Sequence, residues 1–340
     1  MKLSAHLRPL PLLGKKPELG RVYSEIRADL DRVERKLRDL SRSSVRLISE
    51  VGGYLFQKSG KRIRPALVLL CSKAFGARDA ERIVLSSLVE LVHTASLIHD
   101  DIIDNSGTRR GKATLHAKWG PNVTVLLGDH LYIKSINLSL GCRSPRVTAI
   151  LTDVSVRMIE GEIQEFEASG RLDLAERDYL DIIGKKTAAL FSASCRLGGI
   201  LGGATARQEN ALAEYGLNLG LCFQLVDDIL DYTGEENRLG KPVLADMAEG
   251  RITLPLIYAL GRDGSALAGR VKKALADGKG DLEARRDIAG RVRALGGVTY
   301  ALDRAAAFCQ RSKDSLAALP RSACTESLAL LADFVLSRDH

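Results

Sequence analysis

The chain has 340 residues, of which 45% are hydrophobic and 27% charged, so it can bury a substantial core and is not a disordered protein. Its net charge of +8 suits anionic ligands or a membrane surface, but only 5% of residues are aromatic and no stacking motif accompanies the basic ones, so we expect no nucleic-acid partner. The six cysteines lack the short paired spacings of a zinc site or a redox motif, which indicates reduced thiols in a cytoplasmic protein.

Residues 1–18 form a segment with its own character. It carries Lys2, Arg8, Lys15 and Lys16 together with prolines at positions 9, 11 and 17, and it has no sustained apolar core of the kind that signal peptides need. We interpret it as a basic N-terminal arm. No shift in composition marks a linker later in the chain, so we predict a single domain over residues 19–340, with at most peripheral membrane contact.

Apolar residues recur at helical spacing along almost the whole chain, as in Leu88, Leu91, Val92 and Ala95. The alternating stretches typical of strands are hard to find, so we predict an all-α fold, a helical bundle around a central apolar cavity. The predicted helices cover residues 19–40, 43–57, 62–75, 80–104, 119–139, 146–168, 173–195, 206–232, 253–261, 265–277, 281–294, 297–317 and 322–337.

A first acidic cluster ends the predicted helix over 80–104. Asp100 and Asp104 are four residues apart and therefore share one face of this helix, with Asp101 beside them. Like charges one turn apart repel each other, and the negative end of the helix dipole disfavours them further. We therefore expect a positively charged group to bind there.

A second acidic cluster repeats the arrangement at the end of the predicted helix over 206–232. Asp227 and Asp231 are again four apart, with Asp228 between them. Magnesium takes one or two carboxylates and leaves its other positions to water and phosphate oxygens. Each cluster alone is equally typical of a solvated acidic helix end. The two together favour a site in which metals hold a diphosphate between the helix ends.

Basic residues that could bind phosphate accompany both clusters. Three cations, Lys61, Arg62 and Arg64, immediately precede an apolar helix, whose positive dipole end also attracts anions. Further candidates are Arg109 and Arg110, Lys185 and Lys186, and Lys241. Each of these taken singly is more often a solvated charge run. His93 lies on a mostly apolar helix, so it is equally compatible with a core position and with a phosphate contact.

Two segments resemble the aspartate-rich motifs of trans-prenyl diphosphate synthases. They are residues 93–104, HTASLIHDDIID, and residues 223–231, FQLVDDILD, and the resemblance extends from about residue 45 to about residue 260. It implies the isoprenoid synthase fold and a prenyltransferase that uses isopentenyl diphosphate and an allylic diphosphate. It also implies a homodimer.

The same resemblance implies a metal site. Asp100, Asp104 and Asp227 would ligate a cluster of about three Mg2+ ions that grips the diphosphate of the allylic substrate. The other acidic residues of the two motifs would assist, directly or through water: Asp101, Asp228 and Asp231.

Substrate-binding roles carry over in the same way. The residues similar to those that hold the allylic diphosphate are Arg109, Lys186, Gln224 and Lys241. Of the residues placed beside the developing cation, the matches are Thr187 and Gln224. The isopentenyl diphosphate site is matched by Lys61, Arg64, His93 and Arg110.

The chain departs from the family pattern at two positions after the second motif. Arg251 stands where the family usually has a lysine, and Leu244 stands where it usually has a glycine. Arginine keeps the charge but not the compact geometry of an ammonium group. These changes concern how the loop closes over the substrate rather than the chemistry.

Product length depends on side chains below the first acidic cluster. Ser96 and Ala95 lie four and five residues before Asp100, and both are small, whereas short-chain relatives usually carry an aromatic residue there. Each helical turn advances about 5.4 Å, roughly one isoprene unit, so these residues leave a tunnel open. We predict a long-chain product, by resemblance roughly C30 to C40, for a quinone side chain. The alternative is that both residues only allow close helix packing.

Three other functions remain open. A shorter-chain synthase would share both motifs. A class I terpene cyclase has ligands spaced at i, i+4 and i+8, which Asp227, Asp231 and Glu235 meet, but it needs no second diphosphate site. A non-catalytic synthase subunit commonly loses one acidic motif, and both are intact here.

Overall fold

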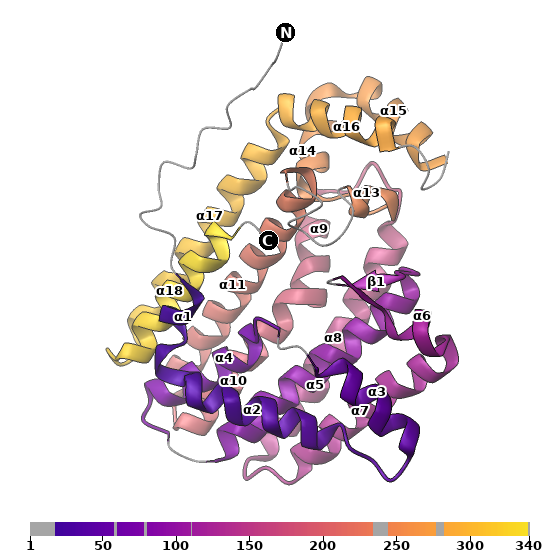
Figure 1. Ribbon diagram of the computed structural model, residues 1–340. Helices are drawn as coiled ribbons and strands as arrows, with labels where there is room; N and C mark the ends of the chain where they lie inside the picture. The colour runs from indigo at the N-terminus through magenta and orange to yellow at the C-terminus, as the bar shows by residue number, and fades with distance from the viewer. Residues whose placement is uncertain are drawn as a thin grey trace.

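The computed structural model describes residues 18–57, 60–77, 80–109, 111–233, 244–276 and 282–338. Helices form nearly all of this part of the chain, which confirms the all-α prediction (Figure 1). The elements in chain order are α1 (Leu19–Val22), η1 (Ser24–Ile26), α2 (Arg27–Leu40), α3 (Arg46–Leu55), α4 (Ile63–Ala74), α5 (Glu81–Ile103), β1 (Thr108–Arg109), β2 (Lys112–Ala113), α6 (Leu115–Trp119), α7 (Pro121–Leu140), α8 (Pro145–Ala168), α9 (Glu176–Ile183), η2 (Gly184–Ala188), α10 (Ala189–Gly202), α11 (Ala206–Thr233), α13 (Ala245–Ala248), α14 (Leu254–Asp263), α15 (Ser265–Ala276), α16 (Leu282–Ala294), α17 (Gly297–Ser315), η4 (Leu316–Ala318) and α18 (Ala323–Ser337).

Helix α11 lies inside the bundle, between α10 and α17, while α10 also packs on α4 and α5 packs on α7. The short helices α14, α15 and α16 form a group at one end, at the top of Figure 1. One apolar cluster joins most helices, and a second lies where α5, α8 and α10 meet, around Leu88, Leu151 and Leu190, which are fully buried.

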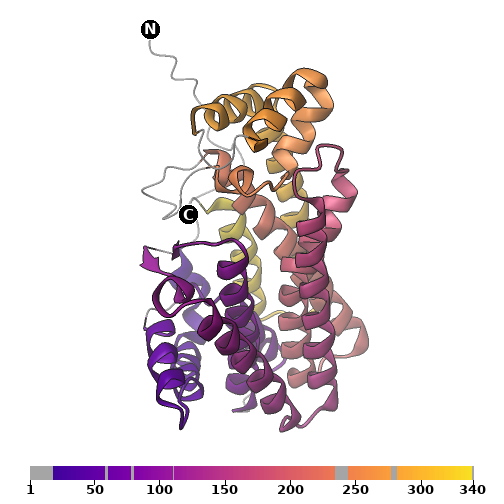
Figure 2. The same ribbon diagram turned by 90° about the vertical axis from the view of Figure 1, so that its right-hand side faces the viewer.

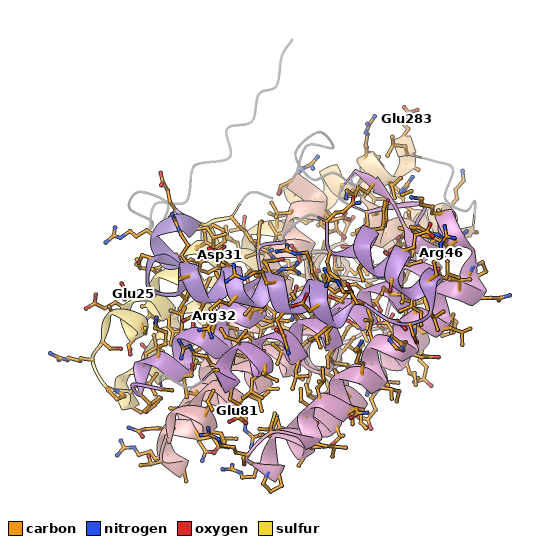
Figure 3. The ribbon with its side chains drawn as sticks, turned by 60° about the horizontal axis from the view of Figure 1, so that its bottom comes forward. Glu25, Asp31, Arg32, Arg46, Glu81 and Glu283 are labelled. Atoms are coloured by element: carbon orange, nitrogen blue, oxygen red, sulfur yellow. The ribbon has the colours of Figure 1, made fainter. Side chains whose placement is uncertain are left out.

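Helix α2 shows how the sequence pattern selects the buried face. Its apolar residues Val33, Leu37 and Leu40 recur every three to four residues and are buried, and α2 packs on α5. Asp31 and Arg32 lie on its exposed side (Figure 3). The helix therefore forms because packing its apolar stripe removes that stripe from water.

Some predicted boundaries are wrong. The predicted helix over 173–195 consists of α9, the π-helical turn η2 and α10, which continues to Gly202. The predicted helix over 119–139 starts instead at Pro121, whose fixed φ suits a first helical position, after Gly120 with φ +82°. Sequence analysis missed α6, α13 and the β1–β2 hairpin because two to five residues are too few for a periodic pattern.

Helix α5 is long and apolar enough to cross a membrane by length and composition alone. It is instead a core helix, because 67% of its most apolar window is buried in the bundle and it ends in the first acidic cluster. The predicted basic arm falls on residues that lie outside the described part of the chain, apart from Glu18.

The turn η2 approaches α11 very closely, and a glycine permits this contact. A Cβ atom at Gly220 would lie 2.5 Å from Ala188 Cα and 2.8 Å from Ala188 Cβ, so the η2 backbone would have to move. We expect Gly220→Ala to lower the free energy of unfolding by about 2 kcal/mol, measured by urea denaturation.

Gly269 is a matched control, because it is also helical and a Cβ atom there would meet nothing within 4 Å. Gly269→Ala should raise the stability by up to about 1 kcal/mol, because alanine has the higher helix propensity. Equal stability changes in the two variants would contradict the close contact.

Candidate active site

The two acidic clusters are joined through one arginine. The Arg251 side chain lies 2.6 Å from Asp104 Oδ1 and 3.3 Å from Asp246 Oδ1. The backbone N–H of Asp246 donates to Asp231 Oδ2 at 3.3 Å. The end of α5 and the end of α11 therefore face one shared region, as the sequence pattern predicted.

Asp100 lies one turn before Asp104 on α5. Burial, with the negative charge of Glu162 as the next cause, raises the pKa of the Asp100 carboxyl to about 7, although Lys186 and Arg109 act in the opposite direction. The Asp100 carboxyl therefore keeps a proton to higher pH than an ordinary aspartate does. A bound cation would replace that proton.

This raised pKa predicts a pH dependence of metal binding. A carboxyl group with a pKa of about 7 must lose its proton to bind a metal, so affinity for Mg2+ with pyrophosphate should fall by up to about tenfold per pH unit below 7. Glu162→Gln removes a charge that raises this pKa, so its affinity should begin to fall at lower pH. Calorimetric titrations from pH 5.5 to 8 measure both curves.

The protonation of pyrophosphate itself affects both proteins equally, so the comparison at each pH isolates Asp100. Parallel curves for the wild-type protein and Glu162→Gln would show that Asp100 does not control the pH dependence.

The first cluster also holds a cation from the β1–β2 hairpin. Arg109 Nε donates to Asp101 Oδ1 at 2.5 Å, and Asp101 is buried. The antiparallel pairing of Arg109 with Lys112 fixes the backbone of Arg109 within the hairpin. Asp101 therefore orients Arg109 toward the first cluster in this arrangement. The neighbouring candidate Arg110 lies outside the described residues.

Two glutamates on α8 complete the acidic region, and sequence analysis missed them. Lys186 Nζ on η2 lies 2.7 Å from Glu162 Oε2 and 2.5 Å from Glu165 Oε2, and Arg251 Nε lies 3.3 Å from Glu165 Oε2. Glu162 and Glu165 are three residues apart on one helix face, a spacing that could have identified them. Lys185, the other cation of the pair, contacts Asp181 instead, at 3.0 Å.

Thr187 and Gln224, predicted to lie beside the reacting carbon, are in contact. Thr187 Oγ1 donates to Gln224 Oε1 at 2.9 Å, and Gln224 Nε2 donates to Asp228 Oδ1 at 2.9 Å. The other oxygen of Asp228 accepts from the hydroxyl of Tyr179 on α9, a residue that sequence analysis did not select. Burial and the charge of Asp246 raise the pKa of Asp228 well above its usual range, although these hydrogen bonds act in the opposite direction.

The oxygens of the second cluster have different partners. Both carboxylate oxygens of Asp231 accept backbone N–H groups, from Ala245 at 3.1 Å and from Asp246 at 3.3 Å. Asp227 Oδ1 lies 2.7 Å from the guanidinium of Arg338, just after α18, whose side chain is almost fully buried. The two clusters thus present Asp100, Asp104 and Asp227 to exchangeable cations, whereas Asp228 and Asp231 are bonded within the protein.

These donors fit Mg2+. Among the described residues no three His, Cys, Asp or Glu side chains converge tightly enough to hold a metal alone. Magnesium does not need such a set, because it binds one or two carboxylates and takes water and phosphate oxygens for the rest. In the structure Arg251 pairs with Asp104, Arg338 pairs with Asp227, and Lys186 pairs with Glu162.

Two of the candidate isopentenyl diphosphate residues, Lys61 and Arg64, lie at the start of α4, and His93 lies on α5. Arg62, which has φ +50°, binds Glu34 at 2.6 Å and also Glu90, so it fastens α4 to α2 and α5. The Arg64 guanidinium lies 4.6 Å from the centre of the Phe191 ring. Lys61, another residue predicted to bind isopentenyl diphosphate, accepts a hydrogen bond from the Tyr23 hydroxyl at its backbone carbonyl.

The two phenyl rings connect this group to the second cluster. Phe191 and Phe223 have ring centres 5.2 Å apart, and the Arg338 guanidinium lies 3.7 Å from the Phe223 centre. Arg64 and Arg338 therefore stack on adjoining rings. Sequence analysis missed Arg338, because a single arginine near the C-terminus carries no motif.

The chain-length positions lie where the helix geometry predicts. Ser96 is half-buried, one turn below Asp100, and its hydroxyl donates to the carbonyl of His93 at 2.9 Å. His93, whose backbone carbonyl accepts this hydrogen bond, is also half-buried. Ala95 is fully buried in the main apolar cluster, so an enlarged side chain there would also disturb packing.

Two features follow the second cluster. Leu244 adopts φ +59°, in the left-handed region that favours glycine, which accounts for the family's usual residue at this position. Leu244 is nevertheless buried, and its N–H donates to Asp231 O at 3.2 Å. The candidate Lys241 lies outside the described residues.

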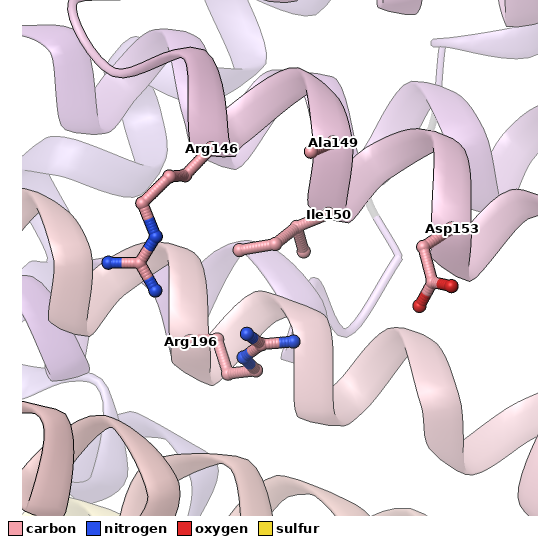
Figure 4. Close-up of a pocket in the computed structure, with 5 residues that line it drawn as sticks. All are labelled: Arg146, Ala149, Ile150, Asp153 and Arg196. Atoms are coloured by element: carbon pink, nitrogen blue, oxygen red, sulfur yellow. The ribbon is translucent and has the colours of Figure 1, made fainter.

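A shallow hollow of about 230 Å³ lies elsewhere, between α8 and α10 (Figure 4). It is lined by Arg146, Ala149, Ile150, Asp153 and Arg196, and none of them is a predicted site residue. Both arginines bind the buried Glu209, at 2.7 Å and 3.1 Å. These contacts tie α8 and α10 to the start of α11.

Comparisons with known proteins agree with this geometry. The polyprenyl synthetase family model matches residues 45–289. The octaprenyl diphosphate synthase of Haemophilus influenzae is 35% identical, over 92% of this chain and 94% of its own. The short chain isoprenyl diphosphate synthase of Methanothermobacter thermautotrophicus is 36% identical, over 95% of this chain and 98% of its own.

Among solved structures, a polyprenyl synthase from Caulobacter crescentus, complexed with calcium and isoprenyl diphosphate, superimposes with a TM-score of 0.92. It is 35% identical and covers 96% of this chain and 100% of its own.

Proposed function

Because the chain belongs to the polyprenyl synthetase family, whose members are prenyltransferases, we propose that it joins isopentenyl diphosphate head to tail to an allylic prenyl diphosphate in a Mg2+-dependent reaction. The product would be a long-chain all-trans polyprenyl diphosphate for a quinone side chain, made in the cytoplasm. The observation that carries the proposal is the link from Asp104 through Arg251 to Asp246, whose backbone N–H donates to Asp231, so that the two acidic helix ends are connected.

The acidic residues would hold the metals and, through them, the allylic diphosphate. In the described part of the chain, Asp104 and Asp227 pair with the side-chain cations of Arg251 and Arg338, which metals can displace, and the raised pKa of Asp100 leaves its carboxyl available for a cation. Bound Mg2+ supplies Lewis-acid neutralisation of the leaving diphosphate. Calcium in the Caulobacter crescentus relative is a cation of the same oxygen-binding class.

Basic side chains would complete the neutralisation of the leaving group. Lys186, on the π-helical turn, and Arg109, on the hairpin, approach Asp100 closely enough to affect its pKa. Once metals take the carboxylates, these cations can donate to phosphate oxygens that the metals leave uncovered. A leaving group neutralised in this way departs with the bonding electrons.

The allylic cation that remains has to be kept from water. Thr187 and Gln224 offer hydroxyl and amide dipoles without a free charge beside that carbon. The double bond of isopentenyl diphosphate then attacks, and a proton leaves the carbon that becomes allylic. We infer that an oxygen of the released diphosphate accepts this proton, because the acidic side chains nearby are already bound.

Isopentenyl diphosphate would bind near Arg64 and His93, beside the Phe191 and Phe223 rings. This second diphosphate site distinguishes a chain-extending enzyme from a terpene cyclase, which ionises a single diphosphate. Both acidic motifs are present, which also argues against a non-catalytic subunit.

One assay tests the function. Radiolabelled isopentenyl diphosphate is incubated with dimethylallyl, geranyl, farnesyl or geranylgeranyl diphosphate and Mg2+, and the dephosphorylated products are separated by chromatography. We expect incorporation that EDTA abolishes and products of roughly C30 to C40. Products of C15 or C20 would identify a shorter-chain synthase. Conversion of farnesyl diphosphate alone would identify a cyclase, and no incorporation with any primer would refute the proposal.

We further propose that the protein is a homodimer joined through α7 and α8, which contact each other (Figure 2). These antiparallel helices expose an apolar stripe with side chains from 54% to 77% exposed: Leu126, Ile133, Leu140, Val156, Ile159, Ile163 and Phe166. An apolar patch of this kind marks an interaction site, and a stripe on two antiparallel helices can pair with its own copy about a two-fold axis.

Light scattering after size exclusion tests the dimer. The wild-type protein should have the mass of two chains and Ile133→Glu the mass of one. Val45→Glu is the control, because Val45 is 53% exposed but lies outside the stripe. A monomeric wild-type protein would refute the dimer.

A further inference from the structure

Tyr179 is a buried polar residue that lies outside the proposed metal and diphosphate contacts. It lies on α9, only 4% exposed, and its hydroxyl donates to Asp228 Oδ2 on α11. Forming this bond cost the phenol and the carboxylate their contact with water. Such a pair needs a compensating role in the fold or in the site.

The bond is the first of a connected series. Asp228 Oδ1 accepts from Gln224 Nε2 at 2.9 Å, and Gln224 Oε1 accepts from Thr187 Oγ1 at 2.9 Å. The series therefore runs from α9 through α11 to the π-helical turn η2. It ends at the two side chains that would lie beside the reacting carbon.

Each bond of the series has a defined donor and acceptor. Tyr179 and Gln224 both donate to Asp228, whose two oxygens are the acceptors. The amide of Gln224 then has its oxygen toward Thr187, so the Thr187 hydroxyl must donate to it. The lone pairs of the Thr187 oxygen are consequently left to face other groups.

We infer that Tyr179 is a positioning residue, which acts through Asp228 to fix Gln224 and, through it, to orient the Thr187 hydroxyl so that its oxygen lone pairs face the developing allylic cation. This inference rests on the proposed condensation. Fixed dipoles stabilise a charge that appears only in the transition state because they need no reorganisation when it forms. Without the phenol, the carboxylate and the amide can each rotate.

The same contacts separate Asp228 from the metal ligands. Both of its oxygens already accept a hydrogen bond from within the protein, whereas Asp227 pairs with the side-chain guanidinium of Arg338. Asp228 therefore stabilises the second motif through these hydrogen bonds, and the metals would contact its neighbour Asp227.

The test compares Tyr179→Phe with the wild-type enzyme in the complete chain. We expect kcat for condensation to fall about 10- to 100-fold, because the buried Asp228 carboxyl loses the hydrogen bond that fixes its orientation. The KM values of both substrates, and the affinity for Mg2+ with pyrophosphate measured by calorimetry, should stay within about threefold.

Tyr215→Phe is the matched control. Tyr215 is also a fully buried phenol, and its hydroxyl donates to the carbonyl of Leu328 at 2.8 Å, outside the site. A similar loss of thermal stability is expected in both variants, but kcat should change less than about twofold in Tyr215→Phe. Equal kcat values in the two variants would overturn the positioning role.

Asp228→Asn decides the question independently, even if Tyr179→Phe does not fold. We expect a lower kcat with unchanged affinity for Mg2+ with pyrophosphate. A large loss of that affinity would make Asp228 a metal ligand and overturn the inference. If the wild-type enzyme itself incorporates no isopentenyl diphosphate, the proposed function fails rather than this assignment.

Discussion

Replacement of Asp100 by alanine is expected to lower turnover about 1,000-fold at saturating Mg2+, equivalent to about 4 kcal/mol of transition-state stabilisation. Asp100 lies where α5, Glu162 and Lys186 meet, and its carboxyl would exchange a proton for a metal. Without it the allylic diphosphate loses part of its neutralisation, and the C–O bond breaks much more slowly. Incorporation of labelled isopentenyl diphosphate at several Mg2+ concentrations measures the loss.

Asp153→Ala is the control for this prediction. Asp153 is also a helical aspartate, but it is exposed and paired with Arg157 at 3.0 Å on the outer side of α8. Its turnover should stay within about twofold of the wild-type value. Turnover of Asp100→Ala near the wild-type value would show that Asp100 does not bind an essential metal.

Replacement of Ser96 by phenylalanine is expected to shorten the product to about C15 or C20, while condensation continues. Ser96 lies one turn of about 5.4 Å below Asp100, so a phenyl ring there would block the path of the growing chain after roughly one or two additions to geranyl diphosphate. Ser96 is only half-buried, so the larger side chain can be accommodated. Chromatography of the dephosphorylated products measures the length.

Ala95→Phe and Leu97→Phe refine this prediction. Ala95→Phe should also shorten the product, but with a loss of stability of about 1–3 kcal/mol, because Ala95 is fully buried. Leu97 points about 100° away around the helix, so Leu97→Phe should leave the length unchanged. If Ala95→Phe and Ser96→Phe both give wild-type products, the chain grows along another path.

The parts of this site that the sequence revealed are those with a repeated local pattern. Asp100 and Asp104, like Asp227 and Asp231, are spaced four apart at the ends of apolar helices, and both pairs reach one region. The all-α fold followed from apolar periodicity for the same reason. Such patterns encode which face of a helix is buried, and the tertiary structure preserves them.

Other parts depend on contacts between distant segments. Arg338 reaches Asp227 across 111 residues of sequence, which no local pattern can show. Tyr179 reaches Asp228 in the same manner, from α9 to α11. The π-helical turn that carries Lys186 and Thr187 has the composition of an ordinary helix, so periodicity placed one continuous helix there.

Arg251 shows how the structure explains a departure from the family pattern. A lysine has one ammonium group, whereas the guanidinium of Arg251 contacts Asp104, Glu165, Asp246 and Glu249 at once. The substitution therefore gives the loop after the second motif several anchors in the protein without metal. These anchors involve the same carboxylates that metal binding would engage.

The most direct test is a crystal structure of the protein with Mn2+ and pyrophosphate, in which anomalous scattering locates the metals. Manganese ions should lie within about 2.3 Å of oxygens of Asp100 and Asp104 from α5 and of Asp227 from α11, with one pyrophosphate bridging the two groups. Manganese bound at only one of these helix ends, with the pyrophosphate elsewhere, would contradict a shared diphosphate site.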